Sequence, residues 1–363
     1  MPDQPALVGP VEIIGAGLLG TSVGLACRRA GLEVALADVV NGHVRTASGL
    51  GAGRERSDGD RPQLVVVAVP PALLGEVIAE ALQRTTAHGA VVTDVGSVKS
   101  APLEVLTTDP EVSGQVHRYV GGHPMAGSER SGPLAASETL FDGRPWAVTP
   151  HDAADPAAVA LVTELAELCG AVPVRLTPEE HDRAVARTSH VPHLMSALVA
   201  GRLAEAPPEH LRLSGQGVRD VTRVAAGDPA LYGQIVAGNA AAVTQLLAEV
   251  RSQLDVLIDA VATGDAETLR DVLEQGVTGA RAIPGKHGGP VTPTVSVFVA
   301  VPDNPGELAR LFADAGQSGV NIEDVYIDHD PGRPVGLVEL VVATDAAAHL
   351  RSSLDSRGWA THQ

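Results

Sequence analysis

The first forty residues contain the feature that most constrains the fold: a glycine-rich turn between a buried strand and a helix. The apolar run at 11–14 predicts the strand, Gly15-Ala16-Gly17-Leu18-Leu19-Gly20 is the turn, and helical spacing continues to Ala30. A second predicted strand, 33–37, ends at Asp38. This succession of a strand, a turn, a helix and a strand that ends in an acid predicts a Rossmann-type unit that binds a dinucleotide.

Each glycine of the turn has an expected role. Gly15 permits the tight turn, Gly17 lets a pyrophosphate approach the backbone at the start of the helix, and Gly20 lets the helix pack closely on the strand. Leu18 and Leu19 lie between them and complete the predicted cofactor site.

Asp38 predicts which dinucleotide binds. Its carboxylate is expected to accept a hydrogen bond from the adenosine ribose 2′-hydroxyl, and it would repel a 2′-phosphate. Because no arginine follows before Arg45, NAD is favoured over NADP. An ordinary turn residue is the alternative for Asp38. The strand predicted at 64–69 ends at Val69 and is followed by Pro70. We also expect these two residues beside the cofactor.

The composition is that of a globular protein without a surface for nucleic acid or anionic membranes. The 363 residues carry a formal net charge of -18 at pH 7, and no basic run offsets it. The N-terminus lacks the pattern of a secretion signal, and the longest apolar stretch, 64–74, is too short to span a bilayer. We therefore expect a cytoplasmic protein of two or three domains.

Two scarce residue types are informative. Cys27 and Cys169 lie in apolar helical patterns, and we expect buried free thiols without a redox or metal role. The chain has only two lysines, Lys99 and Lys286, among 26 lysine and arginine residues. Both lie in glycine-rich loops, where a compact ammonium group fits better than a planar guanidinium. Chance survival of the two lysines is the alternative.

The pattern of elements changes at residue 177. Before it, further strands are predicted at 90–93, 119–121, 146–149 and 172–176, whereas the apolar spacing from 178 to 282 is helical. After a glycine- and proline-rich stretch, strands are expected at 295–301, 321–329 and 336–342, with helices at 305–316 and 345–357.

The predicted fold class is therefore α/β with additional domains. A Rossmann-type NAD-binding domain is expected at 8–177, an all-helical domain at 178–283, a linker at 284–293 and a small α+β domain at 294–363.

Two polar side chains are expected at the carboxyl ends of strands, where parallel sheets bind their ligands. Ser97 follows the strand at 90–93, and His123 follows the strand at 119–121 on a tight Gly/Pro turn. A histidine in that place can take the proton of a substrate hydroxyl while a hydride leaves the same carbon. The sequence thus predicts a dehydrogenase with His123 as proton acceptor.

Four motifs in a fixed order carry a family resemblance. They are Asp94-Val95-Gly96-Ser97-Val98-Lys99, Gly122-His123-Pro124-Met125-Ala126-Gly127-Ser128-Glu129, Ser189-His190-Val191-Pro192-His193 and Arg219-Asp220-Val221-Thr222-Arg223. With the dinucleotide turn, they resemble the prephenate/arogenate dehydrogenase family of tyrosine biosynthesis over nearly the whole chain. A looser signature, Asp303-Asn304-Pro305-Gly306-Glu307 with Gly319-Val320-Asn321-Ile322, resembles an ACT domain, which implies a ferredoxin-like fold for 294–363.

The resemblance implies NAD-dependent oxidative decarboxylation of prephenate to 4-hydroxyphenylpyruvate. His123 would accept the hydroxyl proton, and Ser97 would hydrogen-bond the same hydroxyl beside the nicotinamide. Arogenate is the alternative substrate, and a catalytically silent sensor of NAD and amino acids is a second alternative. A β-hydroxyacid dehydrogenase, which uses a lysine in its helical domain, is excluded because no lysine lies between Lys99 and Lys286.

The helical domain is expected to bind the substrate and to form a homodimer. Arg223 offers a planar fork for a substrate carboxylate, and Asp220, three residues earlier on the same helical face, is expected to orient the guanidinium. An exposed ion pair is the alternative. His193 is expected as a substrate contact, and the resemblance places Glu129 at the mouth of the site. No metal is expected, because the histidine pair at 190 and 193 lacks a third ligand.

The C-terminal domain is expected to bind an amino-acid effector. Asn304, Pro305 and Gly306 begin a helix whose backbone N–H groups can receive a carboxylate, and Asn321 belongs to the same signature. Tyrosine, as feedback inhibitor, is the expected effector.

Overall fold

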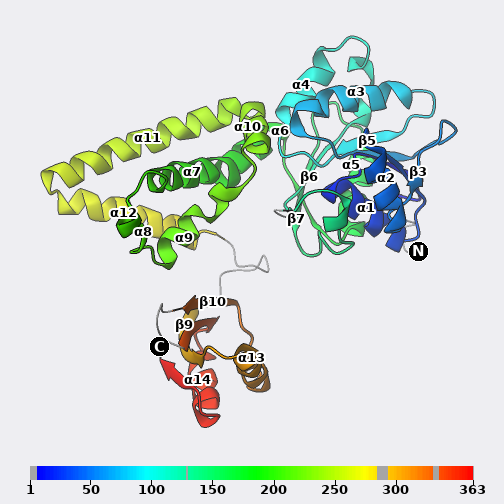
Figure 1. Ribbon diagram of the computed structural model, residues 1–363. Coiled ribbons are helices and arrows are strands. Elements are labelled where there is room, and N and C mark those ends of the chain that lie inside the picture. Colours follow the sequence, from blue (N-terminus) through cyan, green and yellow to red (C-terminus); the bar gives the residue numbers. More distant parts are fainter. Residues whose placement is uncertain (1–5, 128–129, 284–292, 330–334, 363) are drawn as a thin grey trace. The chain divides into compact units, whose positions relative to one another are not determined.

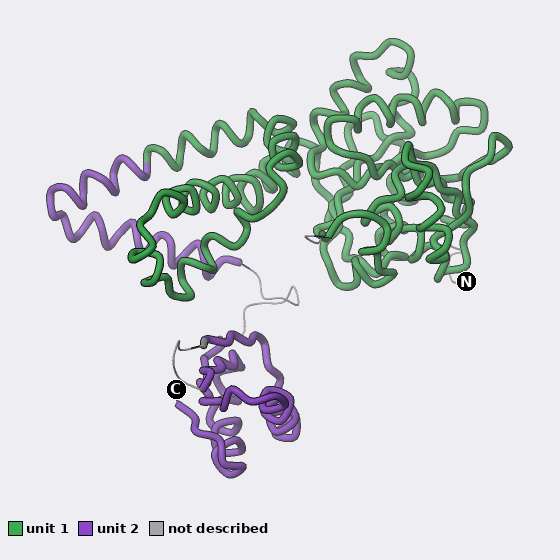
Figure 2. The backbone as a smooth tube through the Cα atoms, in the orientation of Figure 1, with its two compact units in different colours: residues 1–252 green, residues 253–363 purple. Residues whose placement is uncertain are grey.

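The computed structural model describes residues 6–127, 130–283, 293–329 and 335–362. The chain folds into two compact units, Met1–Ser252 and Gln253–Gln363, shown in green and purple in Figure 2. The division falls inside the long helix α11 (Ala240–Thr263). Nearly all of the expected linker at 284–293, Lys286 included, lies outside the described residues. The domain limits at 177, 283 and 293 therefore stay predictions.

The first unit begins with a five-stranded parallel sheet in the order β3-β2-β1-β4-β5 (Figure 1). The strands are β1 (Val11–Ile14), β2 (Val34–Ala37), β3 (Arg54–Glu55), β4 (Leu64–Val67) and β5 (Val91–Asp94). The helices between and after them are α1 (Leu18–Arg29), α2 (Asn41–Gly49), η1 (Pro71–Leu73), α3 (Leu74–Arg84), α4 (Ser100–Thr108) and η2 (Ser113–Arg118).

Helices cover both faces of this sheet, which explains why its strands are continuous apolar runs. In β4, Leu64 and Val66 belong to the core that includes α1, whereas Val65 and Val67 belong to the core that includes α3. Side chains alternate between the two faces of a strand, so both sets must be apolar. The carboxyl ends of the strands meet at one edge of the sheet, and the predicted cofactor residues follow these ends.

A second sheet follows, with β7 (Pro145–Thr149) between β6 (Gly121–Pro124) and β8 (Val172–Arg175). Between these strands lie η3 (Pro133–Ala135) and α5 (Pro156–Leu168). Strand β7 pairs antiparallel with β6 and parallel with β8. This sheet meets the first through a single bridge between Val92 and Tyr119.

The prediction that His123 lies on a turn after its strand is wrong, because His123 lies inside β6, opposite Ala147. The two preceding glycines allow close packing and not a turn. A Cβ on Gly122 would lie 2.6 Å from the carbonyl oxygen of Asp94, and a Cβ on Gly121 would lie 2.4 Å from Oγ1 of Thr149. The strand therefore begins at Gly121, two residues later than predicted at 119.

The helical part begins where the sequence predicted it, and every element within 178–282 is helical. Thr177 starts α6 with a capping box: its side chain accepts from the backbone N–H of Glu180, and the Glu180 side chain accepts from the N–H of Thr177. The elements are α6 (Pro178–Val185), the π-helical turn η4 (Ala186–His190), α7 (Val191–Leu203), α8 (Pro208–Leu211), α9 (Gln216–Thr222), η5 (Arg223–Ala226), α10 (Pro229–Gly238), α11 and α12 (Ala266–Arg281).

The C-terminal module has an antiparallel sheet in the order β10-β11-β9-β12. Its elements are β9 (Thr294–Pro302), α13 (Glu307–Gln317), β10 (Asp324–His329), β11 (Val335–Ala343), α14 (Ala347–Ser356) and β12 (Ala360–His362). This βαββαβ order matches a ferredoxin-like α+β fold. The sequence pattern did not predict β12, because it has three residues and none of them is buried.

Candidate active site

The glycine-rich turn has the shape that a dinucleotide requires. Gly15 adopts φ +105°, and a Cβ there would lie 2.3 Å from the carbonyl oxygen of Ala68. A Cβ on Gly20 would lie 1.9 Å from the carbonyl oxygen of Gly15. By contrast, no atom lies within 4 Å of the Cβ position of Gly17, and α1 begins there without a side-chain cap. The first N–H groups of α1 therefore face open space suited to a pyrophosphate.

Asp38 lies at the end of β2 and joins that strand to the turn. Its carboxylate accepts hydrogen bonds from the N–H of Ala16 and the N–H of Val40, both at 2.7 Å. Nδ1 of His43 lies 3.4 Å from the same carboxylate. The arrangement places a negative charge beside the cofactor turn, as the prediction of NAD selectivity requires.

His123 belongs to a hydrogen-bonded series that sequence reasoning missed. Its Nδ1 lies 2.8 Å from Nε2 of His181, and Nδ1 of His181 lies 2.9 Å from Oδ1 of Asp182. The Asp182 carboxylate also accepts the backbone N–H groups of Lys99 at 2.9 Å and Ser100 at 2.8 Å. His181 and Asp182 are buried, whereas His123 is half-buried.

These contacts determine which nitrogen of His123 is basic. A carboxylate only accepts hydrogen bonds, so His181 donates from Nδ1 to Asp182. A neutral His181 then accepts at Nε2, and His123 must donate from Nδ1. The network thus assigns the unprotonated nitrogen of His123 to Nε2, which is available to take a proton from a substrate.

The charge states of the three groups agree with this assignment. Burial alone would raise the pKa of Asp182, but hydrogen bonds from His181, Ser100 and Lys99 outweigh it and lower that pKa. Burial lowers the pKa of His181 in spite of its carboxylate partner. The pKa of His123 is held well below 6.5, mainly by burial and then by repulsion between its protonated form and the Lys99 ammonium group, or His181 and His190 when these are protonated. At neutral pH His123 is therefore a neutral base.

Ser97 lies between β5 and α4, in the loop that Asp94 anchors by accepting the N–H of Gly96 at 2.7 Å. Its side chain is half-buried. Lys99, two residues later, donates from Nζ to the carbonyl oxygen of Gly122 at 2.7 Å. The Ser97 loop is thus tied directly to the strand that carries His123.

A second histidine cluster lies on η4 and α7. Asn239 donates from Nδ2 to the Asp182 carbonyl oxygen at 2.7 Å and contacts Nδ1 of His190 at 3.2 Å. Burial lowers the pKa of His190 to about 4, so it is a neutral structural residue. His193 stacks on Tyr232 with ring centroids 3.4 Å apart, and its buried Nδ1 has no hydrogen-bond partner among the described residues. That nitrogen is free for a ligand.

The predicted pairing of Asp220 with Arg223 is wrong. Oδ1 of Asp220 accepts instead from Nε2 of Gln216 at 2.8 Å, one turn earlier in α9. Helix α9 ends at Thr222, and Arg223 begins the 3₁₀ turn η5. Arg223 is exposed and has no ion pair within the described parts of the chain. The expected contact Glu129 lies outside the described residues.

In the C-terminal module, the predicted effector loop begins α13. Gly306 adopts φ +95° as the N-cap, without a side-chain cap. Asn304 donates its N–H to the carbonyl oxygen of Pro302 at 2.8 Å, and Asn321 donates from Nδ2 to Glu323 at 2.8 Å. Pro305 lies between Asn304 and the cap. These contacts neither supply nor exclude an effector.

The missed residues did leave a signal in the sequence. His181 and Asp182 occupy positions of α6 that are buried together with Pro178 and Val185, the spacing of an apolar helical face. Polar residues at such positions need hydrogen-bond partners, and an adjacent His-Asp pair can orient another imidazole.

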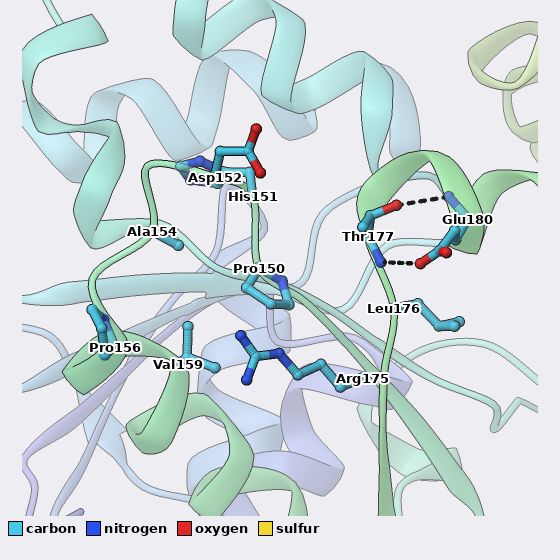
Figure 3. A pocket seen from close by; sticks show the side chains of 10 residues that line it. All are labelled: Pro150, His151, Asp152, Ala154, Pro156, Val159, Arg175, Leu176, Thr177 and Glu180. Carbon is cyan, nitrogen blue, oxygen red and sulfur yellow. Dashed lines mark hydrogen bonds between the residues drawn. The ribbon is translucent and has the colours of Figure 1, made fainter.

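A cavity of about 460 Å³ lies beside this site, between the ends of β7 and β8 and the start of α5. Figure 3 shows the Arg175 side chain extending into it and the Thr177–Glu180 capping box on its wall. Neither Ser97 nor His123 lines this cavity.

Two further features are absent from the described segments. There, no group of three or more histidine, cysteine or acidic side chains could hold a metal ion. No helix in the same segments is long and apolar enough to cross a membrane. Cys27 and Cys169 are buried and free, as predicted.

Comparison with known proteins agrees with this geometry. Residues 23–175 match the family model of the prephenate dehydrogenase nucleotide-binding domain, and residues 177–275 match that of the prephenate dehydrogenase dimerization domain. A probable prephenate dehydrogenase of Streptomyces niveus, NovF, is 38% identical over 361 residues, which cover 96% of this chain and 98% of that protein.

Two solved structures are similar over most of their length. Prephenate dehydrogenase from A. aeolicus, in complex with hydroxyphenyl propionate and NAD+, has a TM-score of 0.67 and 27% identity, covering 74% of this chain and 96% of that one. Synechocystis arogenate dehydrogenase has a TM-score of 0.62 and 28% identity, covering 75% and 98%.

Proposed function

The chain belongs to the prephenate dehydrogenase family, and we propose on that premise that it oxidises prephenate to 4-hydroxyphenylpyruvate with His123 as the base. One observation carries the assignment of the base: the hydrogen bonds from Asp182 through His181 leave Nε2 of His123 as the free acceptor. The glycine turn and Asp38 fit NAD, which supplies the hydride acceptor when bound.

The reaction has two steps, and the protein groups described here act in the first. As the ring hydroxyl proton passes to Nε2 of His123, the hydrogen on the same carbon leaves as a hydride and a carbonyl forms. Ser97 donates a hydrogen bond to the same oxygen and orients it. The ring carboxylate then leaves as carbon dioxide, the electron pair of the broken carbon–carbon bond makes the ring aromatic, and the former carbonyl oxygen takes up a proton to become the phenol hydroxyl.

The substrate anion needs partners in the helical part. Arg223 is an exposed guanidinium that can form two parallel hydrogen bonds with a carboxylate. His193 offers the unpaired Nδ1 beside the ring of Tyr232. Glu129 and Asp220 complete the proposed substrate environment, Asp220 without contact to Arg223.

Regulation and assembly belong to the same proposal. The C-terminal module, with its ferredoxin-like order of elements, is proposed to be an ACT domain that binds tyrosine through Asn304, Pro305, Gly306 and Asn321. The match of 177–275 to a dimerization-domain model supports a homodimer. We place this enzyme in the cytoplasm.

Steady-state assays of NADH formation test the proposal. Prephenate and arogenate are compared at saturating NAD+, and NAD+ is compared with NADP+ on the better substrate. We expect prephenate to have the higher kcat/KM and NAD+ to be preferred, because Asp38 repels a 2′-phosphate. Preference for arogenate would favour the second candidate, which the similarity to arogenate dehydrogenase supports. No reduction with either substrate would refute the proposed activity.

A further inference from the structure

Lys99 is a buried cation to which the proposed chemistry assigns no task. It is 1% exposed. The chain has only two lysines, against 24 arginines. Taking a charge out of water is costly unless the charge is paired. The contacts of Lys99 show what the protein gains from this placement.

The ammonium group of Lys99 joins two strands. Nζ forms an ion pair with Oδ1 of Asp94 at the end of β5, and it donates to the carbonyl oxygen of Gly122 in β6 at 2.7 Å. The second oxygen of Asp94 accepts from the hydroxyl of Tyr119 at 2.8 Å. Gly122 immediately precedes His123 in the strand.

The backbone of Lys99 connects the ends of these two strands to helix α6. Its N–H donates to Oδ1 of Asp182 at 2.9 Å, and this is the oxygen that lies 2.9 Å from Nδ1 of His181. One residue therefore touches β5, β6 and α6, the three elements that carry the Ser97 loop, His123 and His181. A change at Lys99 can move these groups relative to one another.

We propose that Lys99 is a positioning residue of the dehydrogenase: its ammonium group fixes the Gly122 carbonyl, and with it the His123 imidazole, relative to the Ser97 loop and α6, and places a positive charge beside the two imidazoles. The expected effects on kcat and on the pH profile rest on the proposed function, whereas the expected effect on the His123 pKa does not.

The charges around His123 give the proposal a direction. His123 faces His181 of α6, His190 of η4 and Lys99, while Lys99 faces Asp94 of β5, the Tyr119 hydroxyl and Asp182 of α6. A positive charge disfavours imidazolium and so lowers the pKa of His123, in addition to the larger effect of burial. The neutral imidazole is the active form. Loss of the ammonium group should therefore raise this pKa and move the acid limb of the pH profile to higher pH.

Lysine also fits the space better than arginine. A Cβ on Gly121 would lie 2.9 Å from Cδ of Lys99, so the surroundings are already close to the side chain. An ammonium group can donate to two acceptors in different directions, whereas a planar guanidinium has a larger, fixed fork. Lys99→Arg, which keeps the charge and changes the shape, should lose kcat without a shift of the acid limb.

The test uses the full-length enzyme in three variants: Lys99→Met, Lys99→Arg and the double variant Lys99→Met/Asp94→Asn. The double variant leaves no unpaired buried carboxylate. It can therefore be measured even if Lys99→Met fails to fold. Arg28→Met removes one positive charge from the exposed end of α1 and serves as the matched control. Each is measured for kcat/KM against pH, for NAD affinity by calorimetry and for the pKa of His123 by NMR of ¹⁵N-labelled histidine.

We expect Lys99→Met to lose about tenfold or more in kcat and to raise the acid limb and the His123 pKa. The double variant should show the same loss in kcat with a smaller rise in pKa, because it removes the Asp94 carboxylate together with the ammonium group. NAD affinity should stay unchanged, because the cradle at 15–20 is intact. A folded variant with normal kcat and an unshifted His123 pKa would overturn the proposal. If the wild-type enzyme did not oxidise prephenate, the proposed function would fail, yet the NMR titration would still decide the role of Lys99.

Discussion

At the residue scale, His123 illustrates how neighbours make an ordinary imidazole into a directed base. The carboxylate of Asp182, accepting two backbone N–H groups, orients His181, and His181 orients His123. An isolated histidine would sample both tautomers. Here the hydrogen bonds select one, because a carboxylate has no proton to donate.

Replacing His123 by asparagine should reduce kcat by about 10² or more, because a general base of this kind contributes roughly 10² to 10⁴ in rate. NAD affinity, measured by calorimetry, should not change, since His123 is remote in sequence from the glycine turn and absent from its contacts. His210→Asn, at an exposed position of α8, is the matched control and should retain kcat. Equal activity of the two variants would remove His123 from the reaction.

The pH profile of the wild-type enzyme should show the depressed pKa of His123. Burial and positive neighbours lower this pKa well below 6.5, so the base stays neutral and active below that pH. As the pH falls through the lowered pKa, imidazolium forms and kcat/KM declines. An acid limb at or above 6.5 would contradict the assignment of His123 as the group that titrates.

Arg223→Ala should act on binding and not on the proton transfer. Loss of a charge-assisted hydrogen bond costs about 1.5–3 kcal/mol, which corresponds to a KM for prephenate roughly 10- to 100-fold higher, with kcat little changed. Arg219→Ala, one turn earlier and also exposed, removes the same charge and should leave KM near its normal value. A fall in kcat alone would show that Arg223 has a different role.

At the element scale, the position of His181 and Asp182 in the site depends on the stability of α6, because this helix carries both residues. Its start is specified locally by the capping box of Thr177 and Glu180, whose two hydrogen bonds measure 3.0 and 3.1 Å. The sequence predicted this start correctly. Strand β6 shows the opposite case. Gly121 and Gly122 suggest a turn in the sequence, but the close packing around this strand is what requires them.

Thr177→Ala should lower the free energy of unfolding by about 1 kcal/mol, because the N–H of Glu180 loses its side-chain acceptor. Scanning calorimetry would record this as a fall in Tm of about 2–4 °C. The control is Thr107→Ala, since the exposed Thr107 bonds only to carbonyls of its own helix. If both changes lowered Tm equally, the cap would have no special importance.

At the scale of the whole molecule, the chain combines a proposed catalytic part with a C-terminal module of separate fold. The second unit has its own sheet and its own buried core. An effector bound there alters catalysis only if it binds two states of the enzyme with different affinity. Tyrosine resembles the product, so competition at the active site is the simpler alternative.

Truncation after Ile283 distinguishes these two explanations. If tyrosine acts through the C-terminal module, the truncated enzyme should keep its activity and lose its sensitivity to tyrosine, measured as the concentration for half inhibition. The full-length enzyme, assayed at the same substrate concentration, is the control. An active truncated enzyme with unchanged sensitivity would assign tyrosine to the active site and leave the ligand of the module to be found.

Local patterns were sufficient to predict most of the elements of this protein, including the glycine-rich turn at 15–20. The dinucleotide turn, the helical segment from 178 and most of the C-terminal strands and helices follow from periodicity and from glycine residues, because these act over a few positions. The importance of His123 and Ser97 likewise rests on motifs that are continuous in the sequence.

Only the tertiary structure decided what surrounds these residues. His181 and Asp182 are 58 and 59 positions from His123, and the Lys99 ammonium meets Gly122 across 23 positions. Such contacts depend on which strands pair and how a helix packs on them, and no periodicity encodes them. The sequence by itself therefore determined most of the elements and predicted His123 as the base, and the packing of β5, β6 and α6 determined the tautomer and the pKa of His123.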